Sequence, residues 1–266
     1  MSKPPKVSIN LCCYNSERFL EETLQSVFAQ TLEDWELVIV DDGSTDATGQ
    51  IVTKHVGAGR RIRYHYQPNA GLGAARNRAL GLSEGSFIAF IDHDDLWLPT
   101  KLAKQVALFE ARPELGLVYC DCFVEDLGAS EQHRISNLQK LHRGSIFEAL
   151  LERNFIPLLT AMIRREALDD VGGFRLLRLV EDHELFLRVA AKFPVDFVEE
   201  PLARYRFHSG QASRSWKAEL DETLVTYRFW LNSERRRDPN VRRAIRRGCA
   251  RAYYVAGNKA ILVADD

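Results

Sequence analysis

The chain has 266 residues, of which 45% are hydrophobic and 27% charged, and its formal net charge at pH 7 is −1. These values are typical of a globular protein and give no positive field that would attract nucleic acid. No stretch approaches the ~20 apolar residues that span a bilayer, and the apolar run 7–11 is too short for a signal-peptide core. The five cysteines form no CxxC pair, so neither a zinc site nor a disulfide framework is expected. We therefore expect a cytoplasmic protein without a nucleic-acid partner.

Residues 1–125 alternate short β-branched runs with segments of helical periodicity, which is the pattern of a βαβ sheet. The first helix should carry its apolar residues between Phe19 and Phe28, with Asn15 or Ser16 as its N-cap. Two further helices are expected to end near Leu82 and Glu110. The expected strands are residues 7–11, 36–40, 62–66, 87–91 and 117–122.

The pattern changes after residue 125. Residues 126–144 have weak periodicity and are expected to form a loop. Helices are expected near 145–153 and 182–191, an extended run near 156–164, and strands at 195–198 and 202–207. The chain reads as helical from Trp216 onward. The predicted organisation is one domain, 1–215, built from halves 1–125 and 126–215, followed by a helical extension, 216–266.

Carboxylates are concentrated at the C-terminal ends of the second and fourth expected strands. Asp41 and Asp42 follow one strand, and Asp92, Asp94 and Asp95 follow the other. Each group alone is also typical of turns and helix caps. In open α/β sheets, however, ligands bind outside these strand ends, so the joint placement indicates one shared cleft. Because five acids repel each other, the cleft favours a hard cation that takes oxygen ligands, namely Mn²⁺ or Mg²⁺.

These acids belong to a longer series of motifs that follow one another in a fixed order. The series is residues 7–9 with Tyr14 and Asn15; residues 41–46; Asn69 and Gly71 with residues 75–77; residues 90–95 with Pro99; Glu181 and Asp182 with Leu185 and Arg188; and Tyr205, Arg206 and His208. Over residues 5–215 the series resembles family 2 glycosyltransferases of the GT-A fold. The resemblance implies an α/β fold with a mostly parallel central sheet flanked by helices. It also implies sugar transfer from a nucleotide diphosphate to an acceptor hydroxyl, with inversion.

The resemblance assigns the nucleotide to the ends of the first two strands. Cys12, Tyr14 and Asn15 belong to the loop that meets the base, and Tyr14 would stack on it. Asp42 would accept a hydrogen bond from the base imide, which favours a UDP-sugar. Arg76 would approach the diphosphate or the base. This chain has two adjacent cysteines where family members often carry Thr or Pro followed by Ser or Thr. Since thiols are weak hydrogen-bond donors, we expect them to pack rather than to contact the base or act as nucleophiles.

The resemblance assigns the metal to the DxD motif, Asp92-His93-Asp94. Asp94 would contact Mn²⁺ or Mg²⁺ directly, and Asp92 would contact the ribose or a metal-bound water. His93, between them, belongs to the nucleotide site. His208 would complete the metal or diphosphate site when the loop at residues 209–210 closes. The alternative for His208 is an ordinary surface histidine after a strand.

Asp182 matches the catalytic base of the family and would take the proton of the acceptor hydroxyl. The alternative is that Asp182 only caps the helix at 182–191, since aspartate is a favoured N-cap residue. Glu181 and Glu184 are neighbouring candidates for the base, and Glu184 lies about half a turn away on the helix.

The implied acceptor is a saccharide or lipid-linked glycan, in polysaccharide or glycoconjugate biosynthesis. A nucleotidyltransferase should carry a Gly-rich basic loop after the first strand, which is absent here. A non-catalytic nucleotide-sugar or glycan-binding module need not retain both Asp94 and Asp182. Residues 71–76 resemble a dinucleotide fingerprint but lack its final glycine and follow the third strand. The arginine-rich segment 235–251 indicates a solvated helix face, or a peripheral contact with the inner face of a membrane.

Overall fold

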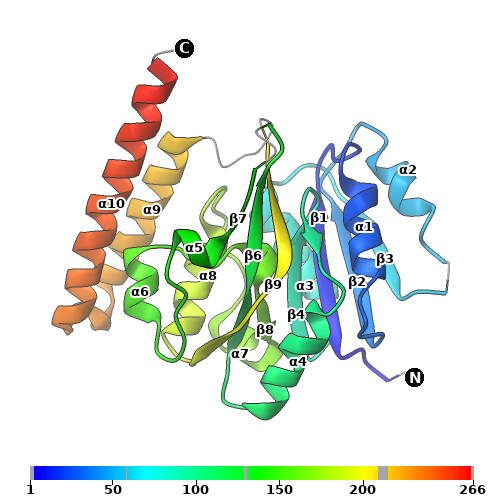
Figure 1. Ribbon diagram of the computed structural model, residues 1–266, viewed down its shortest axis with the longest axis horizontal. Coiled ribbons are helices and arrows are strands. Elements are labelled where there is room, and N and C mark those ends of the chain that lie inside the picture. Colours follow the sequence, from blue (N-terminus) through cyan, green and yellow to red (C-terminus); the bar gives the residue numbers. More distant parts are fainter. Residues whose placement is uncertain (1–2, 58, 129–130, 209–214, 265–266) are drawn as a thin grey trace.

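A computed structural model describes residues 3–57, 59–128, 131–208 and 215–264. Over these residues, one nine-stranded sheet lies between layers of helices (Figure 1). The strands are β1 (Val7–Cys13), β2 (Trp35–Asp41), β3 (Ile62–Tyr66), β4 (Phe87–Asp92), β5 (Leu96–Trp97), β6 (Leu117–Asp126), β7 (Glu131–Arg134), β8 (Met162–Arg164) and β9 (Val195–Phe207).

The helices of the described residues cover both faces of the sheet and continue beyond it at the C-terminus. They are α1 (Leu20–Phe28), α2 (Thr48–Thr53), α3 (Leu72–Leu82), α4 (Lys101–Ala111), α5 (Ile135–Leu138), α6 (Phe147–Glu152), α7 (Arg165–Val171), α8 (Glu181–Ala190), α9 (Trp216–Asn232) and α10 (Pro239–Ala264), with short 3-10 turns η1 (Leu158–Thr160) and η3 (Glu234–Arg237).

The strands follow the order β3-β2-β1-β4-β8-β6-β9-β5, with β7 paired to β6. The long pairings, β1 with β2 and β4, β2 with β3, and β6 with β9, are parallel. The short pairings of β8, β5 and β7 are antiparallel. The predicted fold class, a mostly parallel sheet flanked by helices with a helical C-terminus, is therefore confirmed. Strand β8 lies between β4 and β6 and joins both halves of the chain in one sheet.

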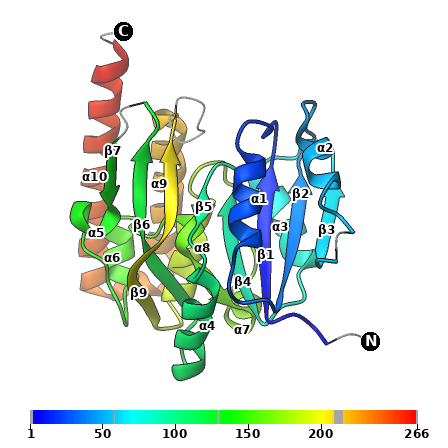
Figure 2. The same ribbon diagram turned by 45° about the vertical axis from the view of Figure 1, so that its right-hand side comes forward.

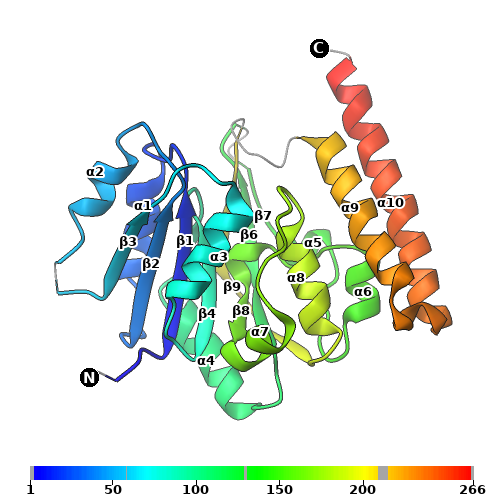
Figure 3. The ribbon, with the colours of Figure 1, turned by 180° about the vertical axis from the view of Figure 1, so that it is seen from behind.

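Alternate residues of the central strands enter opposite cores because successive side chains point to opposite faces. In β2, Leu37 and Ile39 pack in the core under α1 and α4, whereas Val38 and Val40 pack against α3. Every residue of β1 and β2 is buried, as expected for parallel strands covered on both faces. Figure 3 shows α3, α7 and α8 together on the face opposite α1 and α4.

Several predicted local features differ in the structure. Helix α1 begins at Leu20, after Phe19 at the N-cap position, so neither Asn15 nor Ser16 caps it. Their side chains are instead used in the loop that precedes the helix, as described below. The two strands predicted at 195–198 and 202–207 are one continuous strand, β9, which pairs with β6 through register shifts. These shifts are typical of a β-bulge, which lets β9 stay paired with β6 across the gap between the two predicted strands.

The segment predicted as a loop, residues 126–144, contains both a strand and a short helix. Strand β7 extends the sheet by pairing with the end of β6, and α5 follows it directly. The residues of β7 have weak periodicity and form a strand because they pair with β6. This is a tertiary contact, which local sequence patterns do not reveal. The extended run predicted at 156–164 contains the η1 turn and only three residues of strand.

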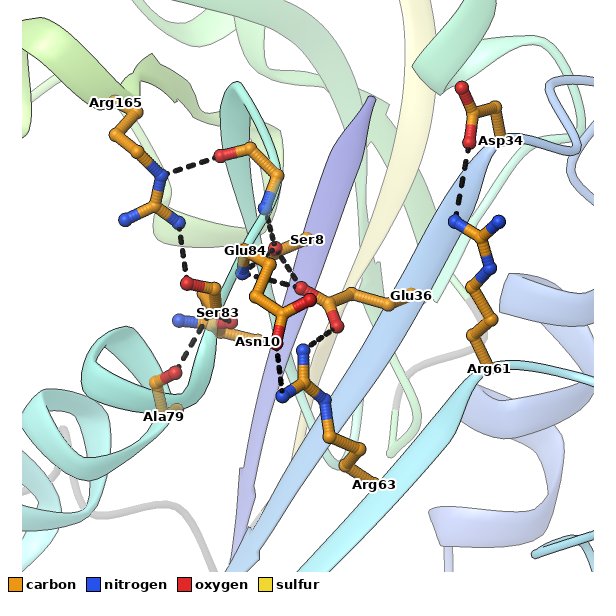
Figure 4. A network of polar contacts seen from close by, with 11 residues as sticks. Ser8, Asn10, Asp34, Glu36, Arg61, Arg63, Ala79, Ser83, Glu84 and Arg165 are labelled. Carbon is orange, nitrogen blue, oxygen red and sulfur yellow. Dashed lines mark hydrogen bonds and ion pairs between the residues drawn. The ribbon is translucent and has the colours of Figure 1, made fainter. Parts of the chain in front are cut away.

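A buried carboxylate anchors the N-terminal edge of the strands. Glu36 accepts hydrogen bonds from Arg63, the Ser8 hydroxyl and the backbone N–H of Glu84 (Figure 4). Burial alone would raise the pKa of Glu36, but these hydrogen bonds outweigh it and hold the pKa below its usual value. Arg165 from α7 adds bonds to the carbonyls of Ser83 and Gly85. This network fastens the edge of the sheet opposite the carboxylates described next.

Helices α9 and α10 pack side by side at one end of the molecule, and β3 lies at the other end (Figures 1 and 2). They bury Tyr227, Trp230 and Ile245 in the core that also contains α6 and α8. Among the described residues, no helix combines the length and apolar character needed to cross a membrane.

Candidate functional site

The candidate site lies at the C-terminal edge of three adjacent parallel strands. Cys12 of β1 is level with Asp92 of β4, and Cys13 is level with Asp41 of β2. Strand β2, the next in the chain, pairs with one edge of β1, and β4 pairs with the opposite edge of β1. This reversal of strand order opens a crevice beyond the strand ends, which is where ligands bind in such sheets.

The loop after β1 is locked onto the loop after β2. Asn15 has a φ of 49°, a left-handed conformation that asparagine tolerates better than most residues. Its N–H donates to Ser44 Oγ over 2.9 Å, and its Oδ1 accepts from the Thr45 N–H over 2.9 Å. The Ser16 N–H donates to Thr48 Oγ1 over 2.7 Å. Asn15 therefore shapes the loop, and a direct nucleotide contact from its side chain stays a prediction.

Two residues of this loop that were predicted to contact the nucleotide differ in their exposure to solvent. Tyr14 is 50% exposed, so its ring is available to a ligand, although stacking on a base stays a prediction. Cys12 is buried in the small core made by Val40 and α3. Burial raises the pKa of the Cys12 thiol to about 12, which leaves no thiolate near neutral pH. Cys12 thus packs in the protein, and only its backbone is placed to face a nucleotide.

The carboxylate of Asp42 orders the loop that leads into α3. It accepts hydrogen bonds from Gln67 Nε2 at 2.7 Å and from the N–H groups of Ala70 at 2.9 Å and Gly71 at 2.8 Å. Gly71 has a φ of 88°, which glycine adopts without strain. A carboxylate offers about four acceptor positions. Three are used here, so capacity for one bond to a base imide is left.

Arg76 joins the two halves of the site. Its side chain comes from α3 and is 7% exposed. One guanidinium nitrogen donates to Asp92 Oδ1 over 2.9 Å, and another donates to Glu181 Oε1. The bridge connects the end of β4 to the start of α8 and brings Asp92 near Asp182, which follows Glu181. Arg76 was expected to approach the diphosphate or the base; the structure shows it as the link between carboxylates, and nucleotide contact stays a prediction.

Asp94 and His208 meet, although 114 residues separate them in the chain. His208 Nε2 lies 3.0 Å from Asp94 Oδ2, and the ring packs 4.8 Å from that of Phe19. The structure thus places His208 at the DxD motif and not on an unrelated surface. His93 is half-buried, and its carbonyl oxygen accepts a hydrogen bond from Thr23, which fixes the turn after β4. Residues 209–210, expected to close over the site, lie outside the described residues.

The donor set at this turn fits a divalent ion that is also held by a diphosphate. Among the described residues, no group of three or more His, Cys, Asp and Glu side chains could hold a metal. Asp94 and His208 supply two ligand atoms 3.0 Å apart. Two neighbouring ligands of an octahedral ion at about 2.1 Å are separated by about 3 Å, so the pair fits. An ion that is held by two protein ligands leaves its other positions to phosphate oxygens and water, as Mg²⁺ commonly does.

Asp95 and Arg206 form a support behind this turn, whereas the sequence pattern had grouped Asp95 with the acids of the cleft. Asp95 is fully buried, and its Oδ1 accepts the backbone N–H of Arg206 over 3.0 Å. Burial and the negative charges of Asp94 and Asp92 raise the pKa of Asp95 well above its usual value. The guanidinium of Arg206 donates to the carbonyl of Asp94 and pairs with Glu22. The only signal in the sequence was a third acid after the DxD pair.

Asp182 lies in the first turn of α8, but it does not cap that helix. The N-cap residue is Val180, and the backbone N–H groups of Leu179 and Val180 donate to Glu222 of α9. Capping, the alternative role for Asp182, is therefore wrong. Burial and the adjacent charge of Glu181 raise the pKa of Asp182 to about 7. A carboxylate with a pKa near the working pH suits a general base.

The two competing acids are engaged elsewhere. Glu184 is buried, and its carboxylate pairs with Arg188 at 2.8 Å and Arg175 at 3.0 Å. Glu181 is held by Arg76. Asp182 has no such cationic partner among the described residues, and it lines a cavity of about 270 Å³ between α8 and the C-terminal helices. Of the three acids, Asp182 is the one that lines this cavity without a cationic partner among the described residues, and its role as the base stays a prediction.

Comparison with known proteins bears on the family to which the chain is related. The family model described as Glycosyl transferase family 2 matches residues 8–179. A putative teichuronic acid biosynthesis glycosyltransferase of Bacillus subtilis, TuaG, is 31% identical over 233 residues, which cover 84% of this chain and 88% of that protein. The chain spans 38% of the length of two other relatives, the uncharacterized glycosyltransferases of Rickettsia felis and Rickettsia conorii, to which it is 27% and 26% identical.

Solved structures share the fold. The mannosyltransferase PcManGT of Pyrobaculum calidifontis, in complex with GDP-Man and Mn²⁺, matches with a TM-score of 0.69 and 19% identity, covering 99% of this chain and 80% of that chain. Residues 1–349 of Staphylococcus aureus TarS, in complex with UDP-GlcNAc, match with a TM-score of 0.66 and 22% identity, covering 86% of this chain and 67% of that chain. At these identities the likeness concerns the fold, and it agrees with the class predicted from the sequence.

Proposed function

This chain belongs to glycosyl transferase family 2, and we propose that it transfers a sugar from a nucleotide diphosphate to an acceptor hydroxyl. The observation that carries the proposal is the Arg76 bridge. It links Asp92 of the DxD motif to Glu181, the neighbour of Asp182, and so supports a site that combines the two kinds of residue that glycosyl transfer needs. One kind stabilises a leaving diphosphate, and the other accepts a proton.

The donor is a UDP-sugar. Its base stacks on the exposed ring of Tyr14, and the imide N–H takes the remaining acceptor position of Asp42. Asp94 and His208 would hold Mn²⁺ or Mg²⁺, and Asp92 would contact the ribose or a metal-bound water. The ion would offset the negative charge that develops on the leaving diphosphate. The loop that carries Asn15 and the turn at His93 keep these groups in position.

Asp182 acts as the base on the acceptor side. With a pKa of about 7, it is largely ionised in mildly alkaline solution and accepts the proton of the attacking hydroxyl. A single displacement, with attack from the face opposite the diphosphate, inverts the configuration of the anomeric carbon. The raised pKa of Asp182 and its open cavity favour an enzyme over a non-catalytic nucleotide-sugar or glycan-binding module.

The acceptor is a saccharide or a lipid-linked glycan in the synthesis of a surface polysaccharide or glycoconjugate. The likeness to a putative teichuronic acid biosynthesis glycosyltransferase of Bacillus subtilis supports this class of pathway. The loop after β1 is tied down by side-chain hydrogen bonds and lacks the Gly-rich form that a nucleotidyltransferase needs for a triphosphate. The transfer is therefore proposed to occur from a finished nucleotide sugar.

The test is thermal stabilisation by nucleotides in the presence of Mn²⁺. UDP with Mn²⁺ should raise the melting temperature more than GDP with Mn²⁺ because the Asp42 acceptor matches the uracil imide. Asp94→Ala should lose the Mn²⁺-dependent part of the UDP effect, whereas Asp169→Ala, at an exposed position of α7, should keep it. A larger shift with GDP would overturn the choice of base. Unchanged Mn²⁺ dependence in Asp94→Ala would place the ion elsewhere.

A further inference from the structure

Two adjacent cavities lie between the α/β domain and helix α10. The larger, of about 390 Å³, has five basic lining residues and a single acidic one, Glu152. Its basic residues are Lys140, His142, Arg153, Arg247 and Arg251. The second, of about 270 Å³, is the cavity lined by Asp182. Glu152, Arg153 and Arg251 line both cavities, so the basic region continues toward the proposed catalytic base.

The acidic residues of these cavities are largely neutralised by partners. Glu152 pairs with Arg247 at 3.1 Å, and Glu219 pairs with Lys259 at 2.8 Å. The buried His183 donates its Nε2–H to the Leu150 carbonyl, and burial lowers the pKa of its ring to about 4, so it adds no charge at neutral pH.

Arg153 and Arg251 remain as positive charges without a carboxylate partner among the described residues. Arg153 is half-buried at the end of α6, and Arg251 projects from α10. Burial and the positive charge of Arg251 lower the pKa of the Arg153 guanidinium, which shows that the two cations repel each other. Like charges held together in a cavity favour binding of an anion between them.

We infer that the acceptor carries a phosphate group that binds between Arg153 and Arg251 while its sugar hydroxyl reaches Asp182. The inference rests on the proposed transfer reaction and adds the chemical class of the acceptor. Guanidinium groups match phosphate oxygens through paired N–H donors, so two arginines on separate helices define a phosphate position. The half-buried Trp216 lines the same cavity and offers an apolar ring face against which a sugar can pack.

A direct binding measurement tests the site without knowledge of the natural acceptor. Glucose 1-phosphate is titrated in EDTA-containing buffer and followed by ligand-observed NMR, with methyl glucoside as the neutral probe. The parent should bind the phosphate and not the neutral sugar. Arg153→Gln and Arg251→Gln should each weaken binding at least about tenfold, since each removes charge-assisted hydrogen bonds. Arg243→Gln, an exposed position of α10 that lines neither cavity, should match the parent.

Two further variants separate this site from the donor site. Asp94→Ala should bind glucose 1-phosphate as the parent does, and both arginine variants should keep the stabilisation by UDP with Mn²⁺. Failure of the UDP response in the parent would count against the proposed function, whereas failure of the phosphate response alone counts against this inference. The inference is overturned if the parent does not bind the phosphate, if both arginine variants bind it like the parent, or if Asp94→Ala abolishes binding.

Competition identifies the source of the phosphate. Displacement of glucose 1-phosphate by farnesyl diphosphate, but not by glycerol 3-phosphate, would show an acceptor on a lipid diphosphate. Displacement by glycerol 3-phosphate, but not by farnesyl diphosphate, would show a soluble glycan that carries phosphate. Displacement by either compound supports the phosphate position. If neither compound displaces glucose 1-phosphate at concentrations well above that of the probe, the phosphate position is contradicted.

Discussion

The role of Asp182 is tested by Asp182→Asn, which keeps the size of the side chain but cannot accept a proton at neutral pH. With a pKa of about 7, Asp182 is about one-tenth ionised at pH 6 and about nine-tenths ionised at pH 8. The parent should therefore transfer sugar about tenfold faster at pH 8 than at pH 6 under kcat/KM conditions. The variant should lose ~10²–10⁴-fold at pH 8 and show no such rise with pH.

The assay follows release of the nucleoside diphosphate from pH 5.5 to 8.5, with the acceptor held well below its KM so that the rate reports kcat/KM. Asp169→Asn makes the same chemical change at an exposed position of α7 and should retain the parent profile. UDP with Mn²⁺ should bind Asp182→Asn as it binds the parent. Near-parent turnover in Asp182→Asn, or an unchanged pH profile, would refute the assignment of the base.

The same pKa makes an independent prediction about stability. The folded protein binds the Asp182 proton more tightly than the unfolded chain, in which the pKa is about 3.8. Between about pH 4 and pH 7 the folded state therefore binds more protons than the unfolded state, so the free energy of unfolding falls as the pH rises. The contribution of Asp182 to stability is fully present below about pH 4 and is lost as the pH rises through about 7. Asp182→Asn should remove this loss, so urea denaturation at pH 8 should show the variant at least as stable as the parent. A variant clearly less stable than the parent at pH 8 would mean that the carboxylate makes favourable contacts in its ionised form.

Two further predictions concern the residues that hold the site together. Arg76→Met should lower the free energy of unfolding by about 3–5 kcal/mol in urea denaturation because it leaves the buried Glu181 without its cation; adding Glu181→Gln should recover part of this loss, and a single-variant loss below about 1 kcal/mol would contradict the role of the bridge. His208→Ala should weaken Mn²⁺-dependent UDP binding by about 10–100-fold in calorimetry, without changing binding in EDTA. Equal weakening in both buffers would mean that His208 contacts the nucleotide and not the metal.

The sequence allowed the fold of residues 1–125 to be predicted well. The apolar run Leu37 to Val40 marks β2, and the alternation of apolar residues with Ser8 and Asn10 marks β1, although both strands are buried on both faces. The contact of Asp94 with His208 agrees with the pairing that the family resemblance implies, because the order of the motifs carries information over 114 residues.

The contacts that the sequence did not show are those that depend on packing between distant segments. Nothing local to Arg76 indicates that it will meet Glu181, and nothing local to Asp95 indicates its bond to the Arg206 backbone. Strand β7 likewise forms because β6 offers it an edge. The segment that leads into α8 is held by Glu222, a residue of the C-terminal helices that lie beyond the family match.

The position of β8 has a consequence for recombining this enzyme with its relatives. Residues 162–164 insert between β4 and β6, so a chimera that joins residues 1–125 to a foreign second half must replace a strand in the middle of its own sheet. Exchange of the segment that begins at α9 leaves the sheet uncut, but the new segment must supply a carboxylate where Glu222 holds the start of α8. New acceptor preferences are therefore more readily introduced at the C-terminal helices than at the apparent midpoint of the chain.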